Sequence, residues 1–218
     1  MARTIHRSPD TVIPYELLMS IQTGTMAYQY KGVPTLKNPF DLALYTMLLW
    51  SARPRTIIEI GSHAGGSALW FADQLTAFAI DGHVFSADLI RVGAVSDPRL
   101  TFLEGDARRP AELFPADLVR RLARPLLVIE DSDHAYGTSK AVLDHFAPLM
   151  SIGEYMVVED GILSAMRVTD DYGGGPARAI AEFLEEPREE RWEIDTGYCD
   201  YFGQNVTWNV NGYLKRVA

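Results

Sequence analysis

The sequence predicts an α/β fold built on a mostly parallel sheet. Between Leu126 and Gly161, two short apolar runs flank a helical pattern, and each run ends on acidic residues. Neighbouring strands of a parallel sheet deliver their carboxyl ends to the edge at which ligands bind. A second observation is the glycine-rich turn from Gly61 to Ser67, which follows another apolar run directly. Such a turn brings backbone N–H groups and a helix N-terminus close to a bound ligand.

The first 50 residues predict a helical segment. A helix fits within Pro14–Met26, and a loop with turn residues follows at positions 28–34. Asn38 before Pro39 is typical of an N-cap followed by proline at the first helical position, and this predicts a helix through Trp50. We expect residues 1–50 to cover the crevice or a partner subunit, and residues 51–218 to form the domain that contains the sheet.

Five apolar runs along the chain predict parallel strands, at positions 56–60, 82–87, 100–103, 126–129 and 155–158. Helices are expected between them, one at 111–123, and another at 177–186 after three consecutive glycines. The terminal segments 192–196 and 205–217 alternate apolar and polar residues, which predicts an antiparallel pair added to the sheet edge.

Composition limits the class of protein. The 218 residues, 47% of them hydrophobic, fit one α/β domain with a single sizeable core. No run approaches the roughly 18 to 20 apolar residues that a membrane span needs. A net charge of −9 disfavours binding to nucleic acid. Because Cys199 is the only cysteine, no internal disulfide can form, and we expect a cytoplasmic location.

Acidic residues at the ends of the first three strands are candidates for cofactor binding. Glu59 precedes the first glycine, where it would crowd a pyrophosphate but suits a cationic ligand, and the glycine spacing is not that of a dinucleotide site. Asp88 is placed to hold a ribose diol, which fits either S-adenosylmethionine or a nicotinamide cofactor. Asp106 either accepts from an adenine amino group or caps a helix. The candidate set is Glu59, Gly61, Ser62, Gly65, Ser67, Asp88 and Asp106.

The next two strands predict a metal site. Asp131 follows one strand, and Glu159 and Asp160 follow the other. Three carboxylates in one crevice repel one another strongly unless a cation joins them. Asp133 is an alternative to Asp131 as a ligand, and its other expected role is that of a helix N-cap.

Several of these motifs resemble known enzymes. The glycine turn with Asp88 and the Gly105-Asp106-Ala107 motif resembles class I S-adenosylmethionine-dependent methyltransferases, and the spaced acids resemble metal-dependent O-methyltransferases. A closer resemblance is to the cephalosporin hydroxylase/rhamnosyl O-methyltransferase family. It is carried by Gly32-Val33-Pro34, Asn38-Pro39-Phe40-Asp41, Asp131-Ser132-Asp133-His134 and Gly212-Tyr213-Leu214.

The resemblance implies a Rossmann-like class I methyltransferase fold, with a seven-stranded sheet, an antiparallel C-terminal hairpin and an N-terminal helical extension. It also implies S-adenosylmethionine and a divalent ion, Mg²⁺ or Mn²⁺. The expected reaction is methyl transfer to a hydroxyl of a small natural product, sugar-bearing or another secondary metabolite such as an antibiotic. Members of such families form homo-oligomers, so we expect at least a dimer.

His134 and Asp131 are the predicted catalytic residues. Asp131 would hold the ion that lowers the pKa of the acceptor hydroxyl, and His134 would accept its proton. Catechol-type enzymes carry a lysine at the position of His134, so the histidine favours an alcohol acceptor. The expected substrate residues are Asp133, Tyr198, Tyr201 and Trp208. The alternatives are a nicotinamide-dependent oxidoreductase and a non-catalytic partner that binds S-adenosylmethionine within a biosynthetic complex.

Overall fold

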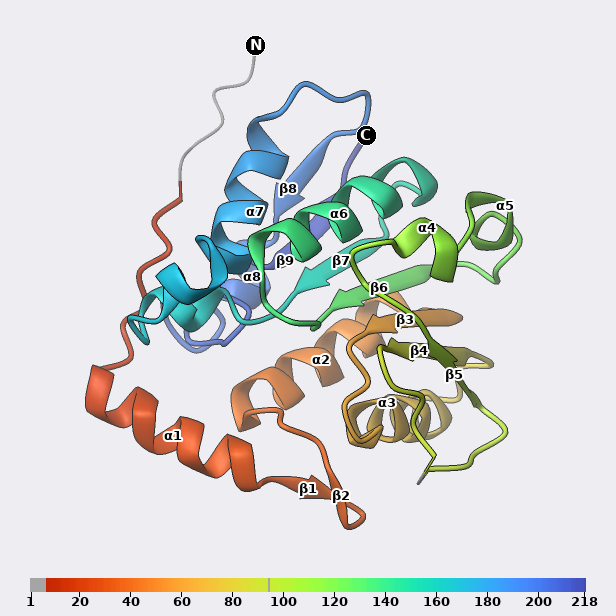
Figure 1. The fold of residues 1–218 in the computed structure, drawn as a ribbon, viewed down its shortest axis with the longest axis horizontal. Coiled ribbons are helices and arrows are strands. Elements are labelled where there is room, and N and C mark those ends of the chain that lie inside the picture. The colour runs from red at the N-terminus through yellow and green to blue at the C-terminus, as the bar shows by residue number, and fades with distance from the viewer. Residues whose placement is uncertain (1–6, 94) are drawn as a thin grey trace.

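The computed structural model describes residues 7–93 and 95–218, so residues 1–6 of the expected cover segment lie outside the described part. One sheet of seven strands dominates it, in the order β5-β4-β3-β6-β7-β9-β8 (Figure 1). The first five strands of this sheet are parallel to one another, and β9 is antiparallel to both β7 and β8. The predicted seven-stranded sheet with an antiparallel C-terminal hairpin is confirmed. The strands are β3 (Thr56–Ile60), β4 (His83–Asp88), β5 (Leu100–Glu104), β6 (Leu126–Glu130), β7 (Tyr155–Val158), β8 (Trp192–Ile194) and β9 (Tyr213–Arg216).

The central strands place their carboxyl ends side by side. Every residue of β3 and β6 is buried, as expected of apolar runs covered on both faces. In the register of these strands Ile60 is paired with both Ala87 and Glu130. The chain adds β4 and β5 on one side of β3, and then returns to add β6 and β7 on the other. The crevice between β3 and β6 is therefore the topological switch point, where α/β sheets bind ligands.

Helices cover both faces of the sheet (Figure 1). On one face α2 (Pro39–Ala52), α3 (Gly66–Ala77) and α8 (Thr196–Cys199) pack around Tyr45, Phe71 and Tyr213. On the other face α6 (Tyr136–Phe146) and α7 (Gly175–Glu185) pack around Phe146 and Phe183. Three single turns, η1 (Ala147–Leu149), η2 (Gly161–Ser164) and η3 (Thr169–Tyr172), complete the connections after α6 and β7.

Three predicted elements differ from the structure. The helix expected at 111–123 is two short helices, α4 (Pro110–Leu113) and α5 (Ala116–Val119), because Pro115 between them has no N–H to continue a helix. The loop expected at 28–34 contains a small hairpin of β1 (Gln29–Tyr30) and β2 (Val33–Pro34). The last expected strand is shorter, because residues 205–212 form buried turns instead.

The N-terminal helices carry the chain to the carboxyl edge of the sheet. Helix α1 (Tyr15–Ala27) lies to one side of the sheet, and the hairpin links it to α2 (Figure 1). The predicted cap of α2 is confirmed, since the Asn38 side chain accepts from the backbone N–H groups of Phe40 and Asp41. Among the residues described, no helix combines the length and apolarity that crossing a membrane requires.

Candidate active site

A cavity of about 830 Å³ opens at the carboxyl edge of the sheet. The turns that follow β3, β4, β5, β6 and β7 all contribute to its walls, and helix α1 and residues 34–36 close another side. Segments from both ends of the sequence therefore meet around one space. Its volume suits a cofactor together with part of an acceptor molecule.

The glycine turn after β3 is pressed against the turn after β6. Gly61 has φ +111°, and a Cβ added there would lie 1.8 Å from the backbone oxygen of Asp131. The backbone N–H of Asp131 in turn donates to the carbonyl of Ile60 over 2.8 Å. Only glycine fits this close approach, which locks the two halves of the cavity together.

Two acids mark the β4 and β5 side of the cavity. Asp88 accepts a 2.8 Å hydrogen bond from the backbone N–H of His63, so the acid is tied to the glycine turn. Asp106 accepts from both the backbone and the side chain of Arg108, at 2.9 Å each. Both acids line the cavity, as do Gly61, Ser62 and Ser67.

Glu59 and Gly65, also predicted to bind cofactor, lie behind the cavity wall. Glu59 is fully buried, and its Oε2 accepts a 2.5 Å hydrogen bond from the hydroxyl of Ser86. Burial raises the pKa of this carboxyl. Gly65 forms the left-handed N-cap of α3, so both residues support the turn from beneath.

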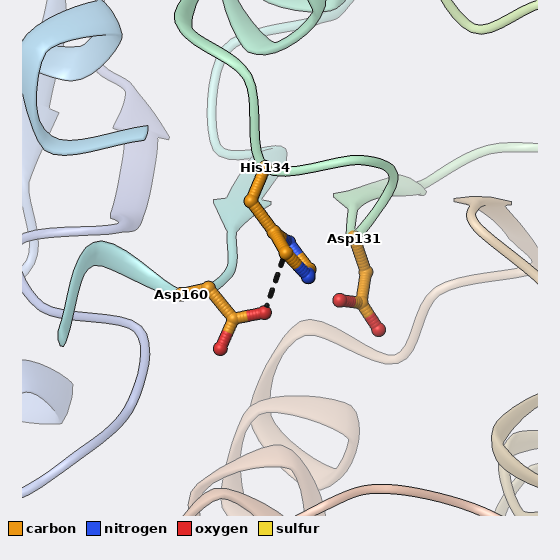
Figure 2. A group of neighbouring side chains, drawn as sticks. All are labelled: Asp131, His134 and Asp160. Atoms are coloured by element: carbon orange, nitrogen blue, oxygen red, sulfur yellow. Dashed lines mark ion pairs between the residues drawn. The ribbon is translucent and has the colours of Figure 1, made fainter. Parts of the chain in front are cut away.

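On the β6 and β7 side, three titratable side chains converge. Nδ1 of His134 lies 3.1 Å from Oδ2 of Asp160, and ligand atoms of Asp131, His134 and Asp160 all lie within 4.8 Å of one another. Figure 2 shows the imidazole of His134 between the two carboxylates. All three side chains line the cavity. This acid–histidine cluster, defined by Asp131, His134 and Asp160, could hold a metal ion.

Two members of the acid–histidine cluster have a strained backbone. His134 has φ 59° and Asp160 has φ 58°, in the left-handed region that non-glycine residues rarely adopt. Each such residue costs on the order of 1 kcal/mol and tends to persist at functional sites.

Glu159, the third predicted metal ligand, lies outside the acid–histidine cluster in this structure. Its carboxylate is buried and does not line the cavity, unlike that of the next residue, Asp160. Oε2 of Glu159 accepts from Nζ of Lys37 over 2.7 Å, and Oε1 accepts from the hydroxyl of Tyr45 over 2.6 Å. The reason is the alternation of side chains at the end of β7, which turns Glu159 towards α2 and Asp160 towards the cavity.

Lys37 also donates to Asp131, so its ammonium lies between the partly exposed Asp131 and the buried Glu159. Burial alone would lower the pKa of Lys37, but the carboxylates of Asp131, Glu159 and Glu59 raise it well above its usual range. Burial raises the pKa of Asp131 to about 8; the Lys37 ammonium opposes this rise and the Asp160 carboxylate adds to it. Burial and the charge of Asp131 likewise raise the pKa of Glu159. The acids remain crowded despite the lysine, which is the condition under which a further cation binds.

The sequence model of the rhamnosyl O-methyltransferase/CmcI family matches residues 22–217. The chain belongs to this family. A rhamnosyl O-methyltransferase of Mycobacterium leprae is 32% identical over 194 residues, which cover 86% of this chain and 82% of that protein. The rhamnosyl O-methyltransferase of Mycobacterium tuberculosis is 30% identical over 195 residues, with coverage of 86% and 77%.

Solved structures agree with this family. A structure of CmcI with Mg and SAM has a TM-score of 0.66 and 27% identity, and it covers 88% of this chain and 78% of its own. The O-methyltransferase TomG from Streptomyces achromogenes has a TM-score of 0.51 and 15% identity over 84% of this chain and 82% of its own, which shows the fold alone. The chain is an S-adenosylmethionine-dependent O-methyltransferase, and the nicotinamide-dependent and non-catalytic alternatives are set aside.

The four predicted substrate residues of this CmcI-family chain separate into two pairs. Asp133 and Trp208 line the cavity. Asp133 also accepts from the backbone N–H of Ala135, but Ala135 is the N-cap of α6 and the helix has no side-chain cap, so Asp133 does not take its expected capping role. Tyr198 and Tyr201 lie outside the cavity lining.

The position of α8 explains why these two tyrosines lie elsewhere. Tyr198 stacks on Tyr213 and shares a 2.6 Å hydrogen bond with Ser51, at the end of α2 that leads into the amino end of β3. These contacts hold the Tyr198 ring between α2 and the face of the sheet, outside the cavity lining. Tyr201 is 57% exposed and packs against Phe202.

Sequence patterns missed the residues that distant segments bring to the site. Lys37 stands alone among uncharged neighbours, and nothing in its spacing links it to acids more than 90 residues later. Gln22 and Tyr172 also line the cavity, from α1 and η3. The sequence does show a surplus of acids at the strand ends, and such a surplus requires a compensating cation. It does not show which residue supplies that cation.

Proposed function

We propose that this family member transfers the methyl group of S-adenosylmethionine to a hydroxyl of a sugar-bearing natural product, with the help of a divalent ion. The observation that carries the proposal is the acid–histidine cluster on the wall of the same cavity that the glycine turn, Asp88 and Asp106 line. The rhamnosyl activity named for the mycobacterial relatives supports a sugar hydroxyl as the acceptor.

The residues present fit a divalent ion. Asp131 and Asp160 offer carboxylate oxygens, which Mg²⁺ and Mn²⁺ prefer, and ligand atoms of the two residues lie within 4.8 Å of each other. These two carboxylates would hold the ion, and the Mg present in the CmcI structure supports its identity. When bound, the ion would supply Lewis acidity that makes a hydroxyl easier to deprotonate. Mg²⁺ sites commonly use only one or two carboxylates and fill the remaining positions with water and substrate.

His134 is suited to accept the proton of the acceptor hydroxyl. Its Nδ1 lies 3.1 Å from Oδ2 of Asp160, so the carboxylate faces this nitrogen and leaves Nε2 as the proton acceptor. The carboxylate of Asp160 also stabilises the imidazolium that forms. Edge-to-face packing of Tyr172 against the ring, with centroids 5.9 Å apart, fixes its orientation from the other side. Base assistance of this kind contributes roughly 10² to 10⁴ in rate.

The acceptor would lie against α1 and Trp208. Nε1 of Trp208 donates to the Gln22 side chain over 2.7 Å, and both residues line the cavity. The backbone N–H of Trp208 donates to Asp41 of α2 over 3.1 Å, which fixes this part of the wall.

A transfer assay with a panel of acceptors tests the proposal. The full chain, supplied with S-adenosylmethionine and Mg²⁺, is offered rhamnosides and other glycosylated natural products beside catechol and caffeoyl-coenzyme A. We expect S-adenosylhomocysteine to form with the glycosides, together with a product that has gained one methyl group on a sugar oxygen. Methylation of catechol or caffeoyl-coenzyme A in preference to every glycoside would contradict the sugar acceptor.

A further inference from the structure

Gln22 carries a carboxamide on the inward face of α1. The residues of this helix that face the body of the protein recur at helical spacing, as Leu18, Ile21, Gln22 and Thr25. Leu18 and Ile21 pack in the apolar cluster that contains Trp208. The hydroxyl of Thr25 donates to the Ile21 carbonyl over 3.0 Å, so this polar group is satisfied within the helix. Gln22 instead reaches outside its helix for a partner and lines the cavity.

The indole of Trp208 fixes which end of the Gln22 carboxamide is left for the cavity. An indole N–H can only donate, so the amide atom that faces it at 2.7 Å is the oxygen Oε1. The N–H groups on Nε2 are therefore directed away from this hydrogen bond. Within residues 7–93 and 95–218, no acceptor receives a hydrogen bond from Nε2 of Gln22. The amide keeps two donors for a ligand.

Trp208 is held firmly enough to orient Gln22 in advance of any ligand. The backbone N–H of Trp208 donates to the buried Asp41 over 3.1 Å, and its carbonyl accepts from the N–H of Ile162 over 3.1 Å. The whole residue is only 3% exposed. A donor that is oriented beforehand loses little freedom when the ligand arrives, so its hydrogen bond contributes more to binding.

The surroundings of Gln22 make its amide the group that can distinguish one hydroxyl pattern from another. Leu163, Met166 and Trp208 belong to one apolar cluster and also line the cavity. An apolar wall of this kind accommodates the apolar parts of a ligand, and a few placed polar groups set its orientation. A site that donates to a particular hydroxyl discriminates against an analogue without it, because the donor is then left unpaired.

We propose that Gln22 is a specificity-determining residue, and that its Nε2 donates a hydrogen bond to a hydroxyl oxygen of the acceptor sugar other than the one that is methylated. The inference rests on the proposed function, since it takes a sugar as the acceptor. The contacted hydroxyl does not react, so the hydrogen bond stabilises the bound acceptor and the transition state equally. It therefore lowers the KM of the acceptor and leaves kcat unchanged.

Kinetics with deoxygenated acceptors test the inference. The probes are the glycoside that turns over fastest in the acceptor panel, expected to be a rhamnoside, and its monodeoxy analogues that keep the methylated hydroxyl. With the wild type, we expect one analogue to lose about three- to tenfold in kcat/KM, the effect of one neutral hydrogen bond. Gln22→Met should raise the KM of the parent glycoside by a similar factor, with kcat and S-adenosylmethionine affinity near the wild-type values. This variant should no longer distinguish that analogue from the parent.

Gln29→Met is the matched control. Gln29 lies in β1 of the same N-terminal segment, is exposed and stands outside the cavity lining, so the same chemical change should leave the KM and the discrimination intact. Gln22→Ala is a second variant that removes the amide with the residue that favours a helix most, and it should lose the same discrimination. Binding of S-adenosylmethionine reports that each variant is folded.

Two results would overturn the inference and leave the sugar acceptor of the proposed function standing. One is a folded Gln22→Met or Gln22→Ala enzyme that discriminates against the same analogue as strongly as the wild type does. The other is a wild type that treats every monodeoxy analogue as it treats the parent glycoside. A wild type that methylates no glycoside would overturn the proposed function, and this inference with it.

Discussion

The two sides of the cavity are built in different ways. On the β3–β4–β5 side, each functional group follows its own strand directly, as Asp88 and Asp106 do. On the β6–β7 side, the acids also follow strands, but Lys37 reaches them from the beginning of the chain. Trp208 comes from close to its end and is held by Asp41 of α2.

This difference matches two tasks: one side of the cavity binds the cofactor, and the other side serves the acceptor. Local strand-to-turn geometry suffices to bind a cofactor that many enzymes have in common. The acceptor side needs a buried charge network with strained residues, and only packing between distant segments can hold such a network. We therefore expect changes on one side to leave the task of the other largely intact, except at Gly61, where the sides touch.

Gly61→Ala should have the largest effect, because it damages both sides at once. The methyl group would overlap the backbone of Asp131 and place alanine at φ +111°. We expect loss of S-adenosylmethionine binding and of transfer, and a fall of at least about 2 kcal/mol in the free energy of unfolding. Urea denaturation and calorimetry measure these effects. Gly24→Ala, in α1 with open space around its Cβ, is the control and should be neutral or stabilising.

His134→Ala should affect the acceptor side alone. We expect turnover to fall by roughly 10² to 10⁴, with S-adenosylmethionine binding unchanged, because the ring lies with Asp160 rather than with the cofactor residues. The loss should be partly relieved at higher pH, where hydroxide can replace the missing base. A pH profile of turnover that keeps the wild-type shape would show that His134 does not accept the proton.

Asp88→Ala should affect the cofactor side alone. Loss of a charged hydrogen-bond acceptor should weaken S-adenosylmethionine binding by roughly 1.5 to 3 kcal/mol. Turnover at saturating cofactor should stay near the wild-type value. Asp81→Ala is the control: its side chain is 98% exposed, just before the opposite end of β4, and it should bind the cofactor normally. Equal weakening in both variants would remove Asp88 from the cofactor site.

Self-association should affect cofactor binding and methyl transfer less than any of the substitutions above. Three aromatic residues of the N-terminal segment, Tyr28, Tyr30 and Phe40, are half-buried within the chain. Helix α1 instead exposes Leu17 by 53% and Met26 by 59%. At least a homodimer through residues 1–50 remains the prediction. Light scattering should give at least twice the chain mass of 24.3 kDa, and a mass equal to one chain would contradict it.

Sequence patterns predicted most of the fold, because the sheet depends on local signals. Apolar runs that end on acids fixed the strands of the parallel sheet, and Asn38-Pro39 fixed the start of α2. The failures were also physical: Pro115 divided a predicted helix, and Tyr198 in α8 packs against Tyr213 and Ser51 of α2 rather than in the cavity lining.

The acceptor side could be predicted only in part. Asp131 and Asp160 were found because each follows a strand, and His134 was found through its place in the same turn. The different directions of Glu159 and Asp160 depend on the end of β7 and on α2, and the partner of Glu159 depends on tertiary packing. Periodicity does not report such contacts.

The independence of the two sides is tested most directly by measuring one chelated sample twice. S-adenosylmethionine binding and methyl transfer are compared before and after treatment with a strong chelator, and again after Mg²⁺ or Mn²⁺ is restored. We predict cofactor affinity within about twofold throughout, no transfer after chelation, and recovery with either oxygen-preferring ion. A chelated enzyme that transfers methyl groups at full rate, or one that loses cofactor binding along with the metal, would contradict this account.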